Sequence, residues 1–162
     1  MSKIHIKKTK VTKDGKISMI WEQQTPKGSW DEYSFTCSEE PRPEFHQALK
    51  DLGQDVITMC ELPESYLDRI TVKGVSYSYG GDNDTMGATI SASMKLEESY
   101  QDLNLNTPHK ASEMYNLDTP EDEMQLLYSD CIERLEALHE ECELYIKGDR
   151  AQGSLFPNNE AA

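Results

Sequence analysis

The chain has 162 residues, of which 36% are apolar and 28% are charged, and its formal net charge is −14. This length fits one domain with a single core, and the low apolar content predicts a thin, well-solvated body. No segment approaches the roughly 20 apolar residues of a membrane span, and the N-terminus lacks the apolar run of a secretory signal, so we expect a cytoplasmic protein.

The first part of the chain predicts an antiparallel meander of three strands. Apolar and polar side chains alternate weakly over 3–12 and more clearly over 16–23 and 30–36, which is the period of a strand with one buried face. Asp14-Gly15 has the composition of a two-residue hairpin turn. Pro26-Lys27-Gly28 favours a second turn.

A helix is predicted after the meander. Ser38 offers a capping hydroxyl, acidic residues follow it, and Pro41 and Pro43 are tolerated in a first helical turn. Apolar residues then recur at helical spacing, at Phe45, Leu49, Leu52, Val56 and Cys60. We expect Gly53 to bend or divide this helix and Pro63 to end it.

Residues 69–95 predict one long β-hairpin. The apolar alternation along its first half changes parity at Gly74, as it does at a β-bulge. The cluster Gly80-Gly81-Asp82-Asn83-Asp84 provides the turn. Residues 100–106 predict a short further strand, and residues 108–116 predict a loop.

The last predicted element is a long amphipathic helix. Thr119-Pro120-Glu121 has the composition of a helix start, and Gly148 suits the C-terminal cap. The apolar stripe comprises Met124, Leu127, Cys131, Leu135, Leu138, Cys142 and Tyr145. The opposite face is acidic, so the stripe either packs on the sheet or forms a coiled-coil dimer. For a single helix beside a sheet, we favour packing on the sheet.

Together these elements predict an α+β fold, an antiparallel sheet of about six strands with two helices packed on one face as a two-layer sandwich. We expect a single domain over 1–148 and a flexible tail over 149–162 with a candidate binding motif. The four cysteines are far apart and form no Cys-x-x-Cys pair, so neither a disulfide framework nor a zinc site is expected. No motif indicates a cofactor.

The tail carries Gln152-Gly153-Ser154-Leu155-Phe156. A Leu-Phe pair in a polar tail predicts docking into a pocket of another protein, although the pair could also fold back on its own domain. The pentapeptide resembles the clamp-binding motif of bacterial DNA replication and repair proteins, Gln-Leu-Ser/Asp-Leu-Phe. The resemblance implies that Gln152 bonds at the rim of the clamp's cleft, that Ser154 takes the third position, and that Leu155 and Phe156 enter the apolar pocket. Gly153 replaces the usual leucine, which predicts weak affinity.

A wider resemblance extends over most of residues 40–156. It rests on Glu40-Pro41-Arg42-Pro43-Glu44-Phe45, Val72-Lys73-Gly74-Val75-Ser76-Tyr77-Ser78-Tyr79, Met86-Gly87-Ala88-Thr89-Ile90, Leu105-Asn106-Thr107-Pro108-His109 and the segment from Ala151 to Phe156. In these segments the chain resembles a family of small uncharacterised proteins of tailed phages and of prophages in gut bacteria. The resemblance implies a mobile-element setting, near replication or recombination genes, and it implies no mechanism.

Few residues suggest catalysis. His109 follows a strand, but a general base needs a nucleophile or a metal within reach, and the sequence identifies neither. Asp82 and Asp84 alternate as calcium ligands do, without the following glycine and distal glutamate of a calcium loop. Thr71-Val72-Lys73 lacks the acidic residue that a metal-dependent nuclease places two positions before its lysine. We therefore favour a non-enzymatic protein without a metal site, with His109 and Asp82/Asp84 as the catalytic candidates to test.

Three functional hypotheses follow. The first is an accessory protein of phage replication or recombination, tethered to the host DNA sliding clamp through Gln152–Phe156. The second is an acidic mimic of DNA, or an inhibitor of a host defence protein, because residues 31–162 carry 28 acidic and 9 basic residues. The third is weak single-strand binding by the seven lysines of residues 1–30 and by aromatic rings. The rings concerned are those of Trp21, Trp30, Tyr33, Phe35, Tyr77 and Tyr79. Direct nucleic-acid binding is disfavoured, because few basic residues flank these rings.

Overall fold

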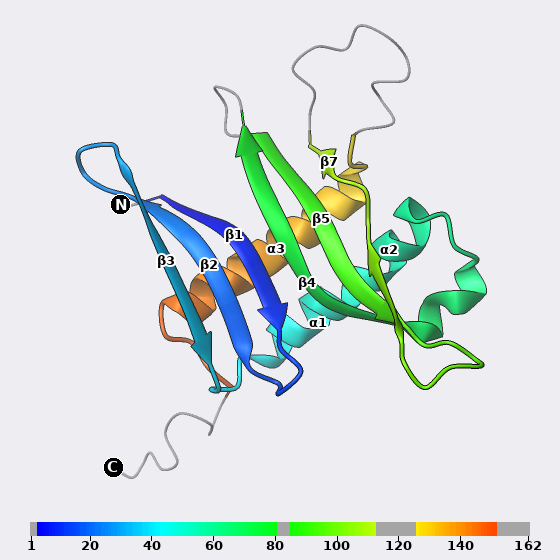
Figure 1. The fold of residues 1–162 in the computed structure, drawn as a ribbon. Helices are drawn as coiled ribbons and strands as arrows, with labels where there is room; N and C mark the ends of the chain where they lie inside the picture. Colours follow the sequence, from blue (N-terminus) through cyan, green and yellow to red (C-terminus); the bar gives the residue numbers. More distant parts are fainter. Residues whose placement is uncertain (1–2, 81–84, 113–125, 152–162) are drawn as a thin grey trace, which may run out of the picture.

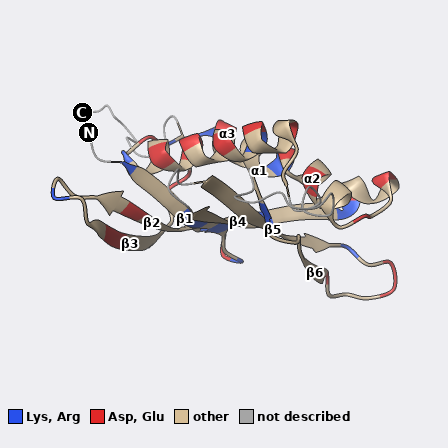
Figure 2. Cartoon of the chain, turned by 90° about the horizontal axis from the view of Figure 1, so that it is seen from above, with Lys and Arg blue, Asp and Glu red and all other residues tan. Residues whose placement is uncertain are grey.

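A computed structural model of the chain describes residues 3–80, 85–112 and 126–151 (Figure 1). Its strands form one antiparallel sheet in the order β3-β2-β1-β4-β5-β6, and β7 also pairs with β5. The helices cover one face of this sheet (Figure 2), which confirms the predicted two-layer α+β fold. The elements are β1 (Ile4–Val11), β2 (Ile17–Gln24), β3 (Trp30–Cys37), α1 (Pro43–Asp51), α2 (Gly53–Met59), the 3-10 helix η1 (Glu64–Arg69), β4 (Ile70–Gly80), β5 (Thr85–Met94), β6 (Leu103–Asn106), β7 (Lys110–Ala111) and α3 (Ser129–Ile146).

The predicted meander is β1-β2-β3, and its first turn is longer than expected. The N–H of Thr12 donates to Lys16 O, and the N–H of Gly15 donates to Thr12 O, each over 2.9 Å. The turn at Asp14-Gly15 therefore has three residues between its closing pair, with Gly15 at φ 83°, a conformation that glycine adopts without a steric penalty. The second turn repeats this arrangement around Gly28, at φ 94°.

The predicted 69–95 hairpin is β4-β5, and its bulge determines how β1 joins the sheet. The pairing passes from Val72 opposite Ala92 to Gly74 opposite Ser91, so Lys73 is the extra residue. A Cβ on Gly74 would lie 2.3 Å from Thr9 O of β1, which explains the glycine, because any side chain would push β1 away. β1 and β4 pair only from Lys8 to Lys10.

The first helix begins later than predicted and is divided as predicted. α1 begins at Pro43, its N-cap residue is Arg42, and no side chain caps it by a hydrogen bond. Ser38 is therefore not the cap, since the prolines that follow it keep the backbone extended. Gly53 opens α2, which confirms the division of the helix. α2 ends at Met59, before Pro63.

The last helix is shorter than predicted. The expected start at Thr119-Pro120 lies outside the described residues, but Leu126 forms a β-bridge with Ala111 and α3 begins only at Ser129. Leu127 is buried without being helical, so it reproduces the helical spacing by coincidence. Within the predicted 108–116 loop, β7 forms a two-residue strand.

The apolar stripe of α3 faces the protein's own sheet. Its described helical members, Cys131, Leu135, Leu138, Cys142 and Tyr145, are at most 2% exposed. The Tyr77 hydroxyl of β4 donates to Leu135 O over 2.7 Å, and α3 also packs against α1 and β1. This packing on the sheet is the alternative that the sequence favoured over a coiled coil.

All four cysteines are free thiols. Burial raises the pKa of the Cys131 and Cys142 thiols to about 12, so both stay protonated and pack as small apolar groups. In the described part of the chain, no helix has the length and apolarity required to cross a bilayer.

Candidate functional site

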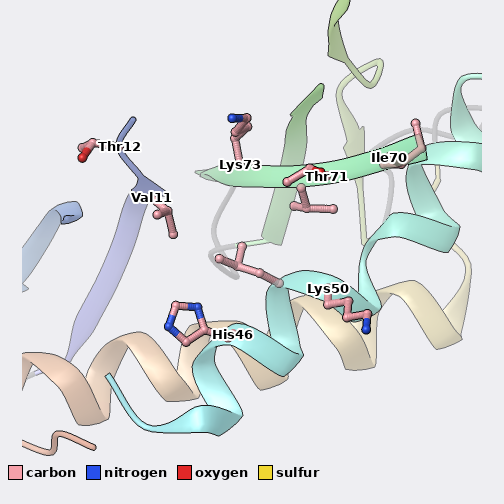
Figure 3. A pocket seen from close by; sticks show the side chains of 9 residues that line it. Val11, Thr12, His46, Lys50, Ile70, Thr71 and Lys73 are labelled. Atoms are coloured by element: carbon pink, nitrogen blue, oxygen red, sulfur yellow. The ribbon is translucent and has the colours of Figure 1, made fainter. Parts of the chain in front are cut away.

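β1 and β4 separate on both sides of their three paired residues, and at the Val11 end the separation leaves a groove of about 400 Å³ (Figure 3). α1 forms the bottom of the groove, the end of β1 forms one side and the start of β4 forms the other. The lining residues are Val11, Thr12, His46, Leu49, Lys50, Ile70, Thr71, Val72 and Lys73.

The groove combines an apolar floor with a cationic rim. Val11, Leu49, Ile70 and Val72 supply the aliphatic surface. Lys50 and Lys73 stand exposed at the rim, and neither forms an ion pair within 3–80, 85–112 and 126–151. Such a combination fits an apolar ligand that carries or adjoins a negative charge.

His46 links the groove to the segment between β3 and α1. Figure 3 shows His46 on α1 and Val11 on β1 pointing toward one another across the groove. The Nε2 atom of His46 lies 2.7 Å from Glu40 Oε2. Glu40 belongs to the segment that joins β3 to α1, so the imidazole ties this segment to the groove.

The end of α3 determines where the tail begins. Gly148, at φ 113°, donates its N–H to Tyr145 O, and Asp149 donates to Leu144 O. These two bonds form a Schellman C-cap and confirm Gly148 at the helix end. The guanidinium carbon of Arg150 then lies 3.7 Å from the centre of the Tyr145 ring, which turns the chain back toward the body.

Two residues after this cap are held on the body. Arg150 Nε donates to Glu39 Oε1 over 2.6 Å, and Ala151 N–H donates to Glu40 O over 2.9 Å. The chain therefore stays attached as far as Ala151, two residues past the expected start of the tail at 149. Ala151 lines a second hollow of about 310 Å³, which shares His46 and Lys50 with the groove.

The sequence-predicted motif residues Gln152, Ser154, Leu155 and Phe156 lie outside the described residues. The same holds for Asp82 and Asp84 of the hairpin turn. The structure thus gives the position from which the motif departs, beside the groove. The geometry of the motif itself stays a prediction.

The catalytic candidate His109 has a hydroxyl partner that the sequence did not reveal. Its Nε2 atom lies 2.8 Å from Ser78 Oγ of β4, and a Cβ on Gly87 would lie 2.6 Å from the same nitrogen. A Ser-His pair acts in catalysis when an acid orients the imidazole and donors stabilise an oxyanion. Among the described residues, His109 has no such acidic partner. We assign the pair to anchoring the segment after β6 on the sheet.

The other end of the seam between β1 and β4 is closed by side chains. Ile6 N–H donates to His139 Nε2 over 3.3 Å, and the Tyr79 hydroxyl donates to Ile6 O over 2.7 Å. Desolvation, assisted by nearby His5, lowers the pKa of His139 to about 4, so the imidazole is neutral at pH 7 and can accept this bond. The His5 ring stacks between Trp30 and Tyr79, with centroids 4.5 and 4.0 Å away.

Of the six rings proposed as a base-stacking platform, only those of Trp21 and Tyr77 are buried, and Tyr33 is 45% exposed. Trp21 and Tyr77 are 8% and 5% exposed and belong to the core beneath the helices. Tyr79 is engaged at the closed end of the seam, and Tyr33 stacks on Trp21 at 5.5 Å. Trp21 and Tyr77 are therefore not available to stack on bases, and stacking on the other rings stays a prediction.

A buried carboxylate joins the two helical segments. Asp55 of α2 is fully buried and accepts two hydrogen bonds of 2.8 Å from the Arg134 guanidinium of α3. The Tyr128 hydroxyl donates to the same carboxylate, and burial together with Asp55 raises the pKa of Tyr128 to about 12. The cluster is a structural connection, because every carboxylate oxygen is occupied.

Sequence reasoning missed this cluster, because its members are 73 and 79 residues apart. Over the part of the chain that the structure describes, no three His, Cys, Asp or Glu side chains are grouped as metal ligands. Comparison with known proteins finds no match: no family model, no curated protein and no solved structure is similar to this chain.

Proposed function

We propose that this protein is a non-enzymatic accessory factor of phage or prophage DNA replication or recombination, acting in the bacterial cytoplasm. In this proposal the segment Gln152–Phe156 binds the host sliding clamp and tethers the folded body to DNA. The observation that supports it is the fixed departure point of the tail. Arg150 and Ala151 are bonded to Glu39 and Glu40, so the body holds the chain up to the residue before the motif.

A short segment that departs from a fixed point suits a tether. The tether raises the concentration of the body near the clamp without any contact between the body and the clamp. Leu155 and Phe156 supply the apolar anchors that a pocket on a partner requires. Ordering a short segment on binding costs conformational entropy, and Gly153 increases this cost. We therefore expect modest affinity.

Binding of the intact chain to purified clamp tests this proposal. The double variant Leu155→Ala/Phe156→Ala is expected to bind at least about tenfold more weakly, which corresponds to 1.4 kcal/mol. The matched control is Asn158→Ala/Asn159→Ala, which alters neighbouring tail residues and leaves the motif intact. Equal affinity of the chain and the Leu155/Phe156 variant would contradict the proposal.

A second candidate function is supported by the charge on the helical layer. Glu133, Glu136 and Glu140 are exposed along one side of α3, and Figure 2 shows acidic residues on the helices. A regular row of carboxylates can occupy a basic, DNA-binding surface on a host defence or replication protein. Such binding should weaken steeply with salt and survive in a chain that ends at Ala151. Binding insensitive to salt would exclude this mimicry.

A further inference from the structure

The tail begins within reach of the groove between β1 and β4. Ala151 lines the hollow that shares His46 and Lys50 with the groove, and these two residues are one helical turn apart, or about 6 Å along the axis. An extended chain covers about 3.3–3.6 Å per residue. The four steps from Ala151 to Leu155 therefore span up to about 14 Å, so Leu155 can enter the groove while Ala151 keeps its bond to Glu40.

The groove and the tail are complementary in chemistry. Residues 152–162 contain two large apolar side chains, Leu155 and Phe156, and one charged residue, Glu160. The groove offers an aliphatic floor, a volume of about 400 Å³ and two exposed lysines at its rim. A volume of this size lies within the range of pockets that hold small ligands. The apolar pair fits the floor, and the acidic residue fits the rim.

The short connection makes even weak docking effective. A short flexible link holds its end near the groove at an effective concentration in the millimolar range. A groove that would bind the separate segment with a Kd of about 1 mM is therefore about half occupied in the intact chain. Two side chains and an open groove are sufficient for affinity of this order.

We propose that this groove is the docking site of the chain's own Leu155–Phe156 segment, and that the sliding clamp competes with the groove for this segment. The docking of the tail is inferred from the groove and from the position of Ala151. The competition with the clamp rests on the proposed function. The body then weakens clamp binding by the fraction of time that the tail is docked.

Methyl and imidazole NMR signals of the full chain, without any clamp, test the docking. The double variant Leu155→Ser/Phe156→Ser is expected to shift the signals of Val11, Val72 and His46. The signals of Ile90, which lies on β5 and does not line the groove, should stay unchanged. The matched variant Asn158→Ser/Asn159→Ser should leave the groove signals in place. If the groove signals of the intact chain and the Leu155/Phe156 variant coincide, the docking proposal is overturned.

Clamp affinity of a groove variant tests the competition. Val11→Thr/Val72→Thr keeps the side-chain shape and makes the two sides of the groove less apolar. With the tail docked about half of the time, this variant should bind the clamp up to about twofold more tightly. Unchanged, measurable clamp affinity would overturn the competition and leave the proposed function standing. Absence of clamp binding in every variant would contradict the proposed function, while the NMR comparison would still decide the docking.

Discussion

The two ends of the seam between β1 and β4 differ in what fills the space where the strands are no longer paired. At both ends the strands lose their mutual pairing beyond Lys8–Lys10. At the Ile6 end, His139 and Tyr79 replace the missing backbone partners, and stacked rings fill the space. At the Val11 end the space stays a groove with two exposed lysines at its rim.

This difference separates a structural end from an end that is available to a ligand. A buried N–H or C=O without a partner costs free energy. At the closed end, side chains form the hydrogen bonds that the N–H and C=O of Ile6 require. The open end has aliphatic surface and charge that no described element covers. Variants at the closed end should therefore change stability, and variants at the open end should change binding.

The largest expected effect comes from the cluster that fixes α3, the helix that carries His139 to the closed end. Arg134→Ala leaves the fully buried Asp55 carboxylate without its cation, which should lower the free energy of unfolding by about 3–5 kcal/mol. Urea unfolding of the full chain measures this change. The exposed neighbour Glu133→Ala is the control, and a loss below about 1 kcal/mol in Arg134→Ala would refute the structural role of the cluster.

A pH dependence should come from the closed end. The pKa of His139 is about 4 in the folded protein and 6.5 as its ordinary value, which we take for the unfolded chain. Between pH 6.5 and 4 the unfolded chain binds a proton that the folded protein excludes, so stability falls as the pH falls through this window. Above pH 6.5 the contribution is complete. The total loss is up to about 3 kcal/mol.

Glu143, whose pKa is raised by burial, titrates in the opposite sense, because its folded form holds a proton more readily than its unfolded form. Because Glu143 Oε2 also lies 2.9 Å from His139 Nδ1, replacing His139 would change the titration of Glu143 as well. The comparison is therefore made between Glu143→Gln and Glu143→Gln/His139→Gln, at several pH values from 7 to 4. The difference in unfolding free energy between the two should shrink toward acid pH. A constant difference would mean that His139 is not the titrating group.

Replacing the hydrogen-bond acceptor at the closed end should have a smaller effect. His139→Leu leaves the buried Ile6 N–H without its partner, at a cost of about 1–3 kcal/mol. Lys73→Ala at the open end removes an exposed side chain and should change stability by less than about 0.5 kcal/mol. Thermal or urea unfolding of both variants tests the comparison directly. Equal effects at the two ends would remove the distinction between them.

A binding effect of moderate size is expected in the tail. Gly153→Leu restores the apolar residue of the clamp-binding pattern and reduces the backbone entropy lost on binding. Clamp affinity should increase about tenfold, or by 1.4 kcal/mol, as measured by calorimetry. Gly153→Ala separates the two contributions, since it changes the backbone without adding the large side chain. An unchanged affinity in Gly153→Leu would argue against the predicted binding mode.

The parts of the fold that the sequence predicted depend on local patterns. Alternation over residues 69–95 gave the β4-β5 hairpin, the parity change at Gly74 gave its bulge, and Gly53 gave the division between α1 and α2. The predicted helix start at Ser38 was wrong, and residues 126–128 are not helical, whereas the predicted start at Thr119 lies outside the described residues. At Ser38 the capping signal competes with the prolines that follow it, and at Leu126 the bridge with Ala111 competes with helix formation.

The sequence by itself determined which faces are apolar and where the chain turns, because these properties repeat with the period of each element. It also placed Leu155 and Phe156 in a polar tail, from which the clamp prediction follows. Only the tertiary structure brought His139 to Ile6, Arg134 to Asp55 and Ala151 to a hollow beside the groove. These contacts join residues far apart in the chain, and their geometry depends on the strand order, which no local period encodes.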